Sequence, residues 1–235
     1  MPMKPISFWH RLFDLISPRL CVVCGHRLSV SEETLCTKCN FHIPRTGFHR
    51  DAYENQMAKL FWGQIPIERA TAFFYYEAHA DTANIIYELK YKHHPEIGEV
   101  VGRMLAKEIQ PSGFFDGIDG IVPVPLAKKR LRQRGYNQSM EIARGVAAIS
   151  RLPIFDKAVS RLFFEGSQTN KGRWDRNANV EKVFELADAD AIRGRHLLLI
   201  DDVVTTGATM MACARELLKA GDVKVSVLAL GFAKS

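Results

Sequence analysis

The stretch that decides the fold runs from residue 196 to residue 209 and reads His-Leu-Leu-Leu-Ile-Asp-Asp-Val-Val-Thr-Thr-Gly-Ala-Thr. Its apolar residues 197–200 predict a strand buried on both faces, as in a parallel sheet. Asp201 and Asp202 follow where we expect that strand to end. A short loop rich in hydroxyl groups comes next, and a helix is expected over 210–220. This order brings backbone N–H groups, threonine hydroxyls and a helix N-terminus to one point, which suits a phosphate group.

The two carboxylates beside this loop suit a sugar or a metal ion. Asp201 and Asp202 can accept hydrogen bonds from ribose hydroxyls or bind Mg²⁺, and Gly207 lets a ligand approach the backbone closely. The run resembles the motif that binds phosphoribosyl pyrophosphate (PRPP) in type I phosphoribosyltransferases. It is not a Walker A loop, because no Gly-Lys-Ser or Gly-Lys-Thr follows. The alternative is an ordinary strand-turn-helix in which the Asp side chains only cap the helix.

The rest of the chain alternates predicted strands and helices, which favours an α/β fold with a parallel or mixed sheet flanked by helices. Ligands of such sheets bind at the carboxyl ends of the strands, where the acidic pair and the loop are placed. The aromatic run at 73–76 falls on an apolar strand, so core packing is favoured over base stacking. The further strands are expected at 70–76, 120–124, 159–164 and 223–232, and the further helices at 81–92, 95–110 and 139–150.

Length and composition are those of a globular protein with one large domain, or with one ordinary domain and a small appendage. The chain has 235 residues and a net charge of +6. No apolar run is long enough to span a bilayer. The apolar residues near the N-terminus are interrupted by His10, Arg11 and Asp14, which predicts a short amphipathic helix rather than a secretory signal. We therefore expect a cytoplasmic protein.

Positive charge is concentrated in two places. Residues 1–50 carry seven Lys and Arg side chains against three acidic ones, and five more cations lie within residues 128–134, in a loop expected after the strand at 120–124. Such clusters favour polyanions, either nucleic acid or a pyrophosphate. The alternative is a solvated basic face, which is the stronger interpretation for the N-terminal excess.

Four of the five cysteines have metal-binding spacing. Cys21 and Cys24 form one C-x2-C pair and Cys36 and Cys39 a second, with eleven residues between the two pairs. Two such turns complete a tetrahedral site of four thiolates, which predicts structural Zn²⁺, with no open position for catalysis. The alternative is a set of ordinary buried thiols. Cys213 lies in the helix after the loop, where packing is favoured over reactivity.

Taken together, these segments resemble the ComF family of competence-associated, phosphoribosyltransferase-like proteins. This chain departs from the family pattern at His93, where glycine is usual, and at Lys182 and Val183, where a Gly-Ala pair is usual. The matching segments are the four-cysteine N-terminus, 89–92, 121–138, Gln168, 176–180 with Phe184, and 201–209.

The resemblance implies a type I phosphoribosyltransferase core with a zinc ribbon in place of the usual base-binding hood. Residues 1–45 would form the N-terminal helix and zinc ribbon, 46–66 a connector, and 67–235 the phosphoribosyltransferase-like domain. It also implies two cofactors, structural Zn²⁺ and Mg²⁺ with PRPP. The implied roles are as follows: Asp201 and Asp202 for catalysis at the ribose; Thr205, Thr206, Gly207, Ala208 and Thr209 for the 5-phosphate; Lys128, Lys129 and Arg130 for pyrophosphate, with Lys90 and Arg134 as further candidates; and Cys21, Cys24, Cys36 and Cys39 for the metal.

Three functions stay open at this point. The first is a transferase that moves ribose 5-phosphate from PRPP to an acceptor that no residue identifies. The second is a PRPP-binding module that handles single-stranded DNA during natural transformation, together with proteins of the DNA-uptake machinery. The third is a PRPP sensor or regulator without catalysis.

Overall fold

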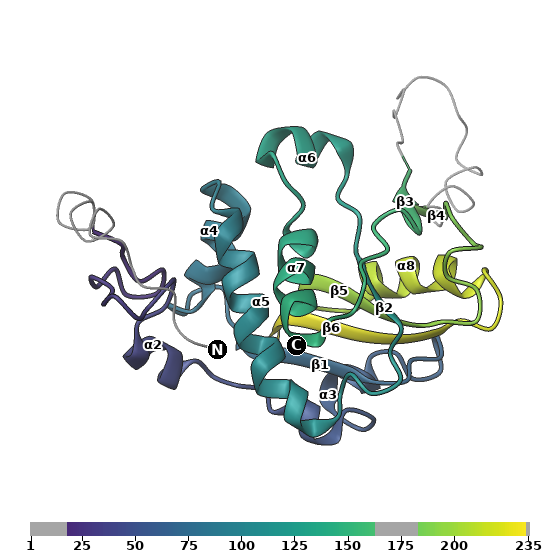
Figure 1. The fold of residues 1–235 in the computed structure, drawn as a ribbon, viewed down its shortest axis with the longest axis horizontal. Coiled ribbons are helices and arrows are strands. Elements are labelled where there is room, and N and C mark those ends of the chain that lie inside the picture. Colours follow the sequence, from purple (N-terminus) through teal and green to yellow (C-terminus); the bar gives the residue numbers. More distant parts are fainter. Residues whose placement is uncertain (1–17, 163–182, 234–235) are drawn as a thin grey trace, which may run out of the picture.

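A four-stranded parallel sheet forms the centre of the protein (Figure 1). The structure, a computed structural model, describes residues 18–162 and 183–233. The order of the strands is β1-β6-β5-β2, so β5 and β6 are central. Their bounds are β1 (Ala70–Tyr76), β2 (Gly120–Pro123), β5 (His196–Val204) and β6 (Lys224–Ala233). This confirms the predicted α/β class with a parallel sheet.

The side chains of β5 alternate between two hydrophobic clusters, one on each face of the sheet. Leu198 and Ile200 face a cluster with helices α4 (Ala83–Tyr91), α5 (Pro95–Ile109) and α7 (Gln138–Ser150). Leu197 and Leu199 face a second cluster with α3 (Gln56–Lys59) and α8 (Ala208–Leu218). A strand covered on both faces needs apolar residues at every position, which explains the uninterrupted run at 197–200.

The N-terminal segment with the four cysteines packs against α4 and α5, beside them in Figure 1. It contains α2 (Thr37–His42), and its Leu28, Leu35 and Ile43 are buried in the first cluster. Arg45 holds the end of the segment, because its Nε donates to a Glu108 carboxylate oxygen at 2.8 Å. The stretch 46–66 contains a 3-10 helix, η1 (Phe48–Asp51), and α3, and it packs under the sheet through Phe48, Met57 and Phe61.

The segment 128–134 is a helix, α6 (Lys128–Arg134), so the prediction of a loop there was wrong. Lys, Arg and Gln have good helix propensity, and Gly135, with φ of 79°, ends the helix in a left-handed cap. After it, β3 (Val159–Arg161) and β4 (Phe184–Leu186) form a separate antiparallel pair. Figure 1 shows α6 and this pair at the same end of the molecule.

Some predicted features lie outside the described residues. These are the N-terminal amphipathic helix and the motif positions Gln168 and 176–180. A short 3-10 helix, η2 (Gln110–Ser112), completes the secondary structure of the described part. Within residues 18–162 and 183–233, no helix has both the length and the apolar character needed to cross a bilayer.

Helices α5 and α7 approach closely because glycines face each other between them. A Cβ on Gly145 would overlap the Glu99 carbonyl oxygen, and one on Gly102 would lie 2.5 Å from the Ile142 carbonyl oxygen. This contact fixes the position of α7, whose N-terminus reaches the carboxyl edge of the sheet.

We predict that Gly145→Ala destabilises the protein by about 1–3 kcal/mol through overpacking. Intrinsic helix propensity alone predicts the opposite, a gain of about 1 kcal/mol. Urea unfolding monitored by circular dichroism measures the difference, with the reverse change Ala148→Gly on the exposed side of α7 as the control. Ala148→Gly should cost only the propensity difference. A Gly145→Ala variant as stable as the parent would show that the helices are not in close contact there.

Candidate functional site

The acidic pair lies at an open edge of the sheet. Asp201 and Asp202 are part of β5, which continues to Val204 because β6 pairs with it along this length. The prediction that the strand ends before them was therefore wrong. On the other side, pairing with β2 stops where Pro123 faces Ile200. Beyond that point the β2 side of β5 is unpaired in the sheet, and a cavity begins.

Hydrogen bonds hold the carboxylates in place. Ser139 donates from Oγ to Asp201 Oδ1 at 3.0 Å, and the Asp202 backbone N–H donates to the same oxygen at 2.9 Å. Lys90 Nζ forms an ion pair with Asp202 Oδ1 at 2.9 Å. Asn137 sets the position of Ser139 by capping α7, because its side chain accepts from the Ser139 N–H and donates to the Val124 carbonyl oxygen.

Asp201 is a carboxyl group that resists ionisation in this environment. Burial, followed by the charge of Asp202, raises its pKa from an ordinary value of 3.8 to about 7. The two hydrogen bonds to its oxygen and the nearby Lys90 act in the opposite direction. A cation bound beside the pair would favour the charged form of Asp201, so the pair is suited to a cationic or hydroxyl-bearing ligand.

Cations from three elements surround the pair in a cavity of about 210 Å³. Of the residues predicted for pyrophosphate, Arg130 lines this cavity, and so do the further candidates Lys90 and Arg134. Lys128 and Lys129 are on the same helix as Arg130 but do not line it. The cavity thus combines two carboxylates with several cations, which matches a sugar that carries phosphate groups.

Arg161 and Ser139 are among the cavity residues that were not predicted from sequence. Arg161 comes from β3, its guanidinium lies 5.2 Å from the centre of the Phe184 ring, and burial lowers its pKa. Nothing near Arg161 in the chain marks it as a site residue, because the antiparallel β3–β4 pair brings it there. Ser139 had a usable signal, since Asn137 is a favourable N-cap residue directly before α7.

The predicted phosphate loop adjoins the acidic cavity. A second hollow of about 50 Å³ is lined by Asp201 and residues 203–210, so it shares Asp201, Val203 and Thr209 with the first. Gly207 is the N-cap of α8 with φ of 76°, a conformation that favours glycine. The structure therefore brings Thr205, Thr206, Gly207, Ala208 and Thr209 together at the N-terminus of an eleven-residue helix.

The turn after α4 positions Lys90. His93 has φ of 57°, which explains why the resembled family has glycine there. The His93 ring Nδ1 lies 3.1 Å from the Arg134 carbonyl oxygen, and the Tyr136 hydroxyl donates to the Leu89 carbonyl oxygen at 2.6 Å. These contacts tie the end of α4 to the segment between α6 and α7.

We predict that His93→Gly is more stable than His93→Ala by about 1 kcal/mol, because alanine keeps the cost of the left-handed backbone and glycine does not. Both variants lose the contact to the Arg134 carbonyl oxygen, so their difference isolates the backbone. Thermal and urea unfolding measure it. Equal stability of the two variants would contradict a left-handed residue 93.

The four predicted cysteines meet in one cluster, with all their sulfur atoms within 4.8 Å of one another. The Cys24 and Cys36 sulfurs are 3.8 Å apart, which matches the edge of about 3.8 Å expected for a tetrahedron with metal–sulfur bonds of about 2.3 Å. Backbone N–H groups of Cys36 and Cys39 donate to the sulfurs of Cys21 and Cys36. The cluster is therefore suited to hold one metal ion.

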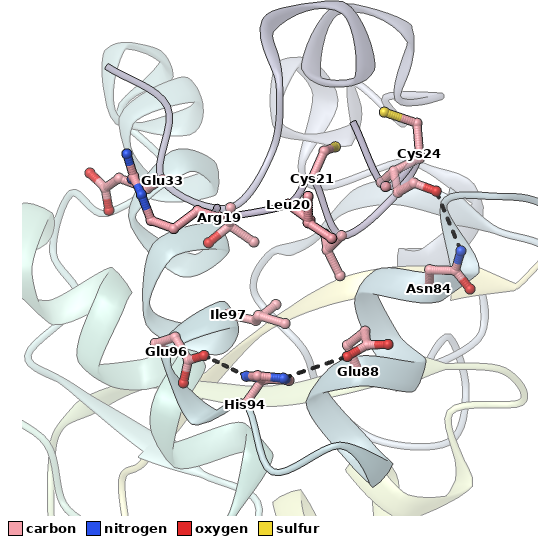
Figure 2. Close-up of a pocket in the computed structure, with 14 residues that line it drawn as sticks. Arg19, Leu20, Cys21, Cys24, Glu33, Asn84, Glu88, His94, Glu96 and Ile97 are labelled. Atoms are coloured by element: carbon pink, nitrogen blue, oxygen red, sulfur yellow. Dashed lines mark hydrogen bonds and ion pairs between the residues drawn. The ribbon is translucent and has the colours of Figure 1, made fainter. Parts of the chain in front are cut away.

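A larger cavity of about 720 Å³ lies between the cysteine segment and helices α4 and α5 (Figure 2). His94 stands on its floor, with Nδ1 2.7 Å from Glu96 and Nε2 3.9 Å from Glu88. Glu33 adds a third carboxylate to the lining. The lining combines three carboxylates with His94 and Arg19, so this cavity is less suited to an anion than the smaller, cation-lined cavity on β5.

The chain was compared with known proteins. No protein-family model matches the chain. The DNA utilization protein YhgH of Escherichia coli is 28% identical over 214 residues, which cover 90% of this chain and 89% of YhgH. Competence protein F of Haemophilus influenzae is 23% identical over 220 residues, covering 89% and 95%. The chain is a homologue of YhgH and competence protein F. The ComF resemblance found in the sequence is confirmed.

Two further matches are partial. Competence protein ComFC of Bacillus subtilis is 37% identical over 101 residues, which cover 43% of this chain and 39% of ComFC. Among solved structures, the glutamine PRPP amidotransferase from B. subtilis matches 57% of this ComF homologue and 26% of its own chain, at 19% identity and a TM-score of 0.37.

Proposed function

We propose that this ComF homologue binds PRPP in the cavity on β5 and handles single-stranded DNA in a PRPP-dependent way. The observation that carries the first part is the junction of three elements in one place: the acidic pair Asp201 and Asp202, the loop at the N-terminus of α8, and a group of cations. Each matches one part of PRPP. The second part is supported by the names of the homologues, DNA utilization protein and competence protein.

The hollow formed by residues 203–210 receives the 5-phosphate, because its N–H groups and threonine hydroxyls are hydrogen-bond donors at a helix N-terminus. Asp201 and Asp202 accept hydrogen bonds from the ribose hydroxyls. Arg130 and Arg134 on α6 and Arg161 on β3 bind the pyrophosphate, since their guanidinium groups line the cavity and can donate paired hydrogen bonds to phosphate oxygens. Lys90 already pairs with Asp202 and adds charge at the centre.

The donor set fits Mg²⁺. Carboxylate oxygens are its preferred protein ligands, and it is commonly held by one or two carboxylates together with substrate phosphates. Asp201 and Asp202 would hold the ion, which would neutralise charge on the pyrophosphate. The Lys90 ammonium group is paired with Asp202 in the structure. A magnesium ion held by Asp202 would displace Lys90, which could then contact a phosphate group instead.

Transfer of the ribose 5-phosphate group to an acceptor is the second candidate. It is favoured by the presence of both acids, since simple phosphate binding requires only the loop and the cations. In such a reaction the bond from the anomeric carbon to pyrophosphate breaks and a bond to the acceptor forms, with pyrophosphate released. A coupled pyrophosphate assay with nucleobase and DNA acceptors distinguishes an enzyme from a binding protein or sensor.

We predict that Asp201→Asn with Asp202→Asn weakens PRPP affinity by at least about tenfold, because each charge-assisted hydrogen bond contributes about 1.5–3 kcal/mol. Calorimetric titration with PRPP and Mg²⁺ measures the loss. The fold should persist, since Asn has the shape of Asp at both positions and, at Asp201, replaces a carboxyl group whose pKa is raised by burial. Asp190→Asn is the control, because the Asp190 side chain is almost fully exposed and does not line the cavity. Undiminished PRPP affinity in the folded double variant would refute the site.

We also propose that the cysteine cluster holds structural Zn²⁺, because four thiolates leave no open coordination position. The purified, reduced protein should contain about one Zn²⁺ per chain. Cys36→Ser should lose the ion and lower the melting temperature, since the metal ties the N-terminal segment together. Cys213→Ala, which changes a buried cysteine of α8 outside the cluster, should retain the zinc. Elemental analysis gives the content, and a zinc-free protein of undiminished stability would refute the proposal.

A further inference from the structure

Two tyrosine rings lie side by side on the exposed face of α4. Tyr87 and Tyr91 are one helical turn apart, their ring centres are 5.3 Å apart, and 49% and 60% of their surfaces are exposed. Neither residue belongs to the hydrophobic core clusters or to the cavity on β5. Each ring leaves aromatic surface open to a partner.

A cation accompanies each ring. Lys92 Nζ lies 5.8 Å from the centre of the Tyr87 ring, and the Arg134 guanidinium lies 5.3 Å from that of Tyr91. Aromatic rings interleaved with Lys and Arg are the arrangement that binds unpaired bases and their phosphates. We call Tyr87, Tyr91, Lys92 and Arg134 the tyrosine track.

Hollows on both sides continue the tyrosine track across the surface. One, of about 320 Å³, is lined by both tyrosines together with residues of the 76–86 segment. The other, of about 520 Å³, is lined by Lys90, Tyr91, His93, Arg130, Gln133 and Arg134, with no acidic residue among them. Lys90 lines both hollows and also the cavity on β5. An extended polyanion can therefore lie along α4 and reach the edge of the PRPP site.

We propose that the tyrosine track and its flanking hollows bind single-stranded nucleic acid, an inference that rests on the DNA-handling part of the proposed function. Bases stack on Tyr87 and Tyr91, while the phosphates contact Arg130, Arg134 and Lys92. Duplex DNA is disfavoured because its bases are already stacked on one another and present no free face to the rings. A purely electrostatic contact would require the cations but not the paired rings.

Binding of a labelled oligothymidylate of about 15 nucleotides, followed by fluorescence anisotropy, tests the proposal. Tyr87→Ala with Tyr91→Ala should weaken binding at least about tenfold, because a base on an aromatic ring contributes about 1–3 kcal/mol. Tyr87→Phe with Tyr91→Phe should bind as the parent does, since the stacking faces remain. Tyr53→Ala is the matched control: Tyr53 is 63% exposed and has Arg69 6.0 Å from its ring, but it lies outside the track.

The proposal is overturned if the double alanine variant binds the strand as tightly as the parent, or if the parent binds no strand. PRPP titration of the same proteins separates the two ideas. If the parent protein binds the strand but no PRPP, and the double alanine variant loses strand binding, the tyrosine track is supported and the PRPP site is refuted. If the parent binds PRPP but no strand, the PRPP site is supported and the tyrosine track is refuted. Circular dichroism of each variant checks that the exposed substitutions leave the fold intact.

Discussion

The structure depends on how far β5 is paired on each of its two sides. β6 follows it to Val204, while β2 leaves it after Ile200. The backbone that carries Asp201 and Asp202 is therefore held straight by one neighbour and open on the side of the other. A strand that ended at residue 200 would place both acids on a loop with more conformational freedom. A strand paired on both sides would close the cavity with backbone.

Charge at this edge has to be balanced, because two adjacent and largely buried carboxyl groups repel each other. The balance comes from distant parts of the chain. Lys90 arrives on α4, Ser139 on α7, and Arg161 on the β3–β4 pair. The positions of α4 and α7 depend in turn on the glycine contact between α5 and α7 and on the turn at His93. The packing of the helices therefore determines which charged groups surround the acidic pair.

The features that sequence predicted are those with a local cause. The apolar run, the acidic pair and the Thr-Thr-Gly loop are recognised from residues that lie within a few positions of one another. The same is true of each C-x2-C pair. The helix at 128–134 was missed because Pro123 and Pro125 with dense positive charge suggested a loop, although Lys and Arg favour helix. Arg161 reaches the cavity through tertiary contacts that no spacing along the chain encodes, and Lys90 was a candidate only through the family resemblance. The end of β5 was misplaced because the apolar run stops at residue 200, whereas pairing of β5 with β6 continues to Val204.

Lys90 connects the acidic cavity with the tyrosine track, and this shared position has a physical consequence. Its ammonium group can neutralise Asp202 or a phosphate at the entrance, but one ammonium group does not fully serve both. Arg130 and Arg134 line the same two regions. In the proposed function, PRPP in the cavity changes the charge available to a strand outside it, and the strand changes the charge available to PRPP. Coupling between these two proposed ligands would follow from shared cations alone, without any movement of the fold.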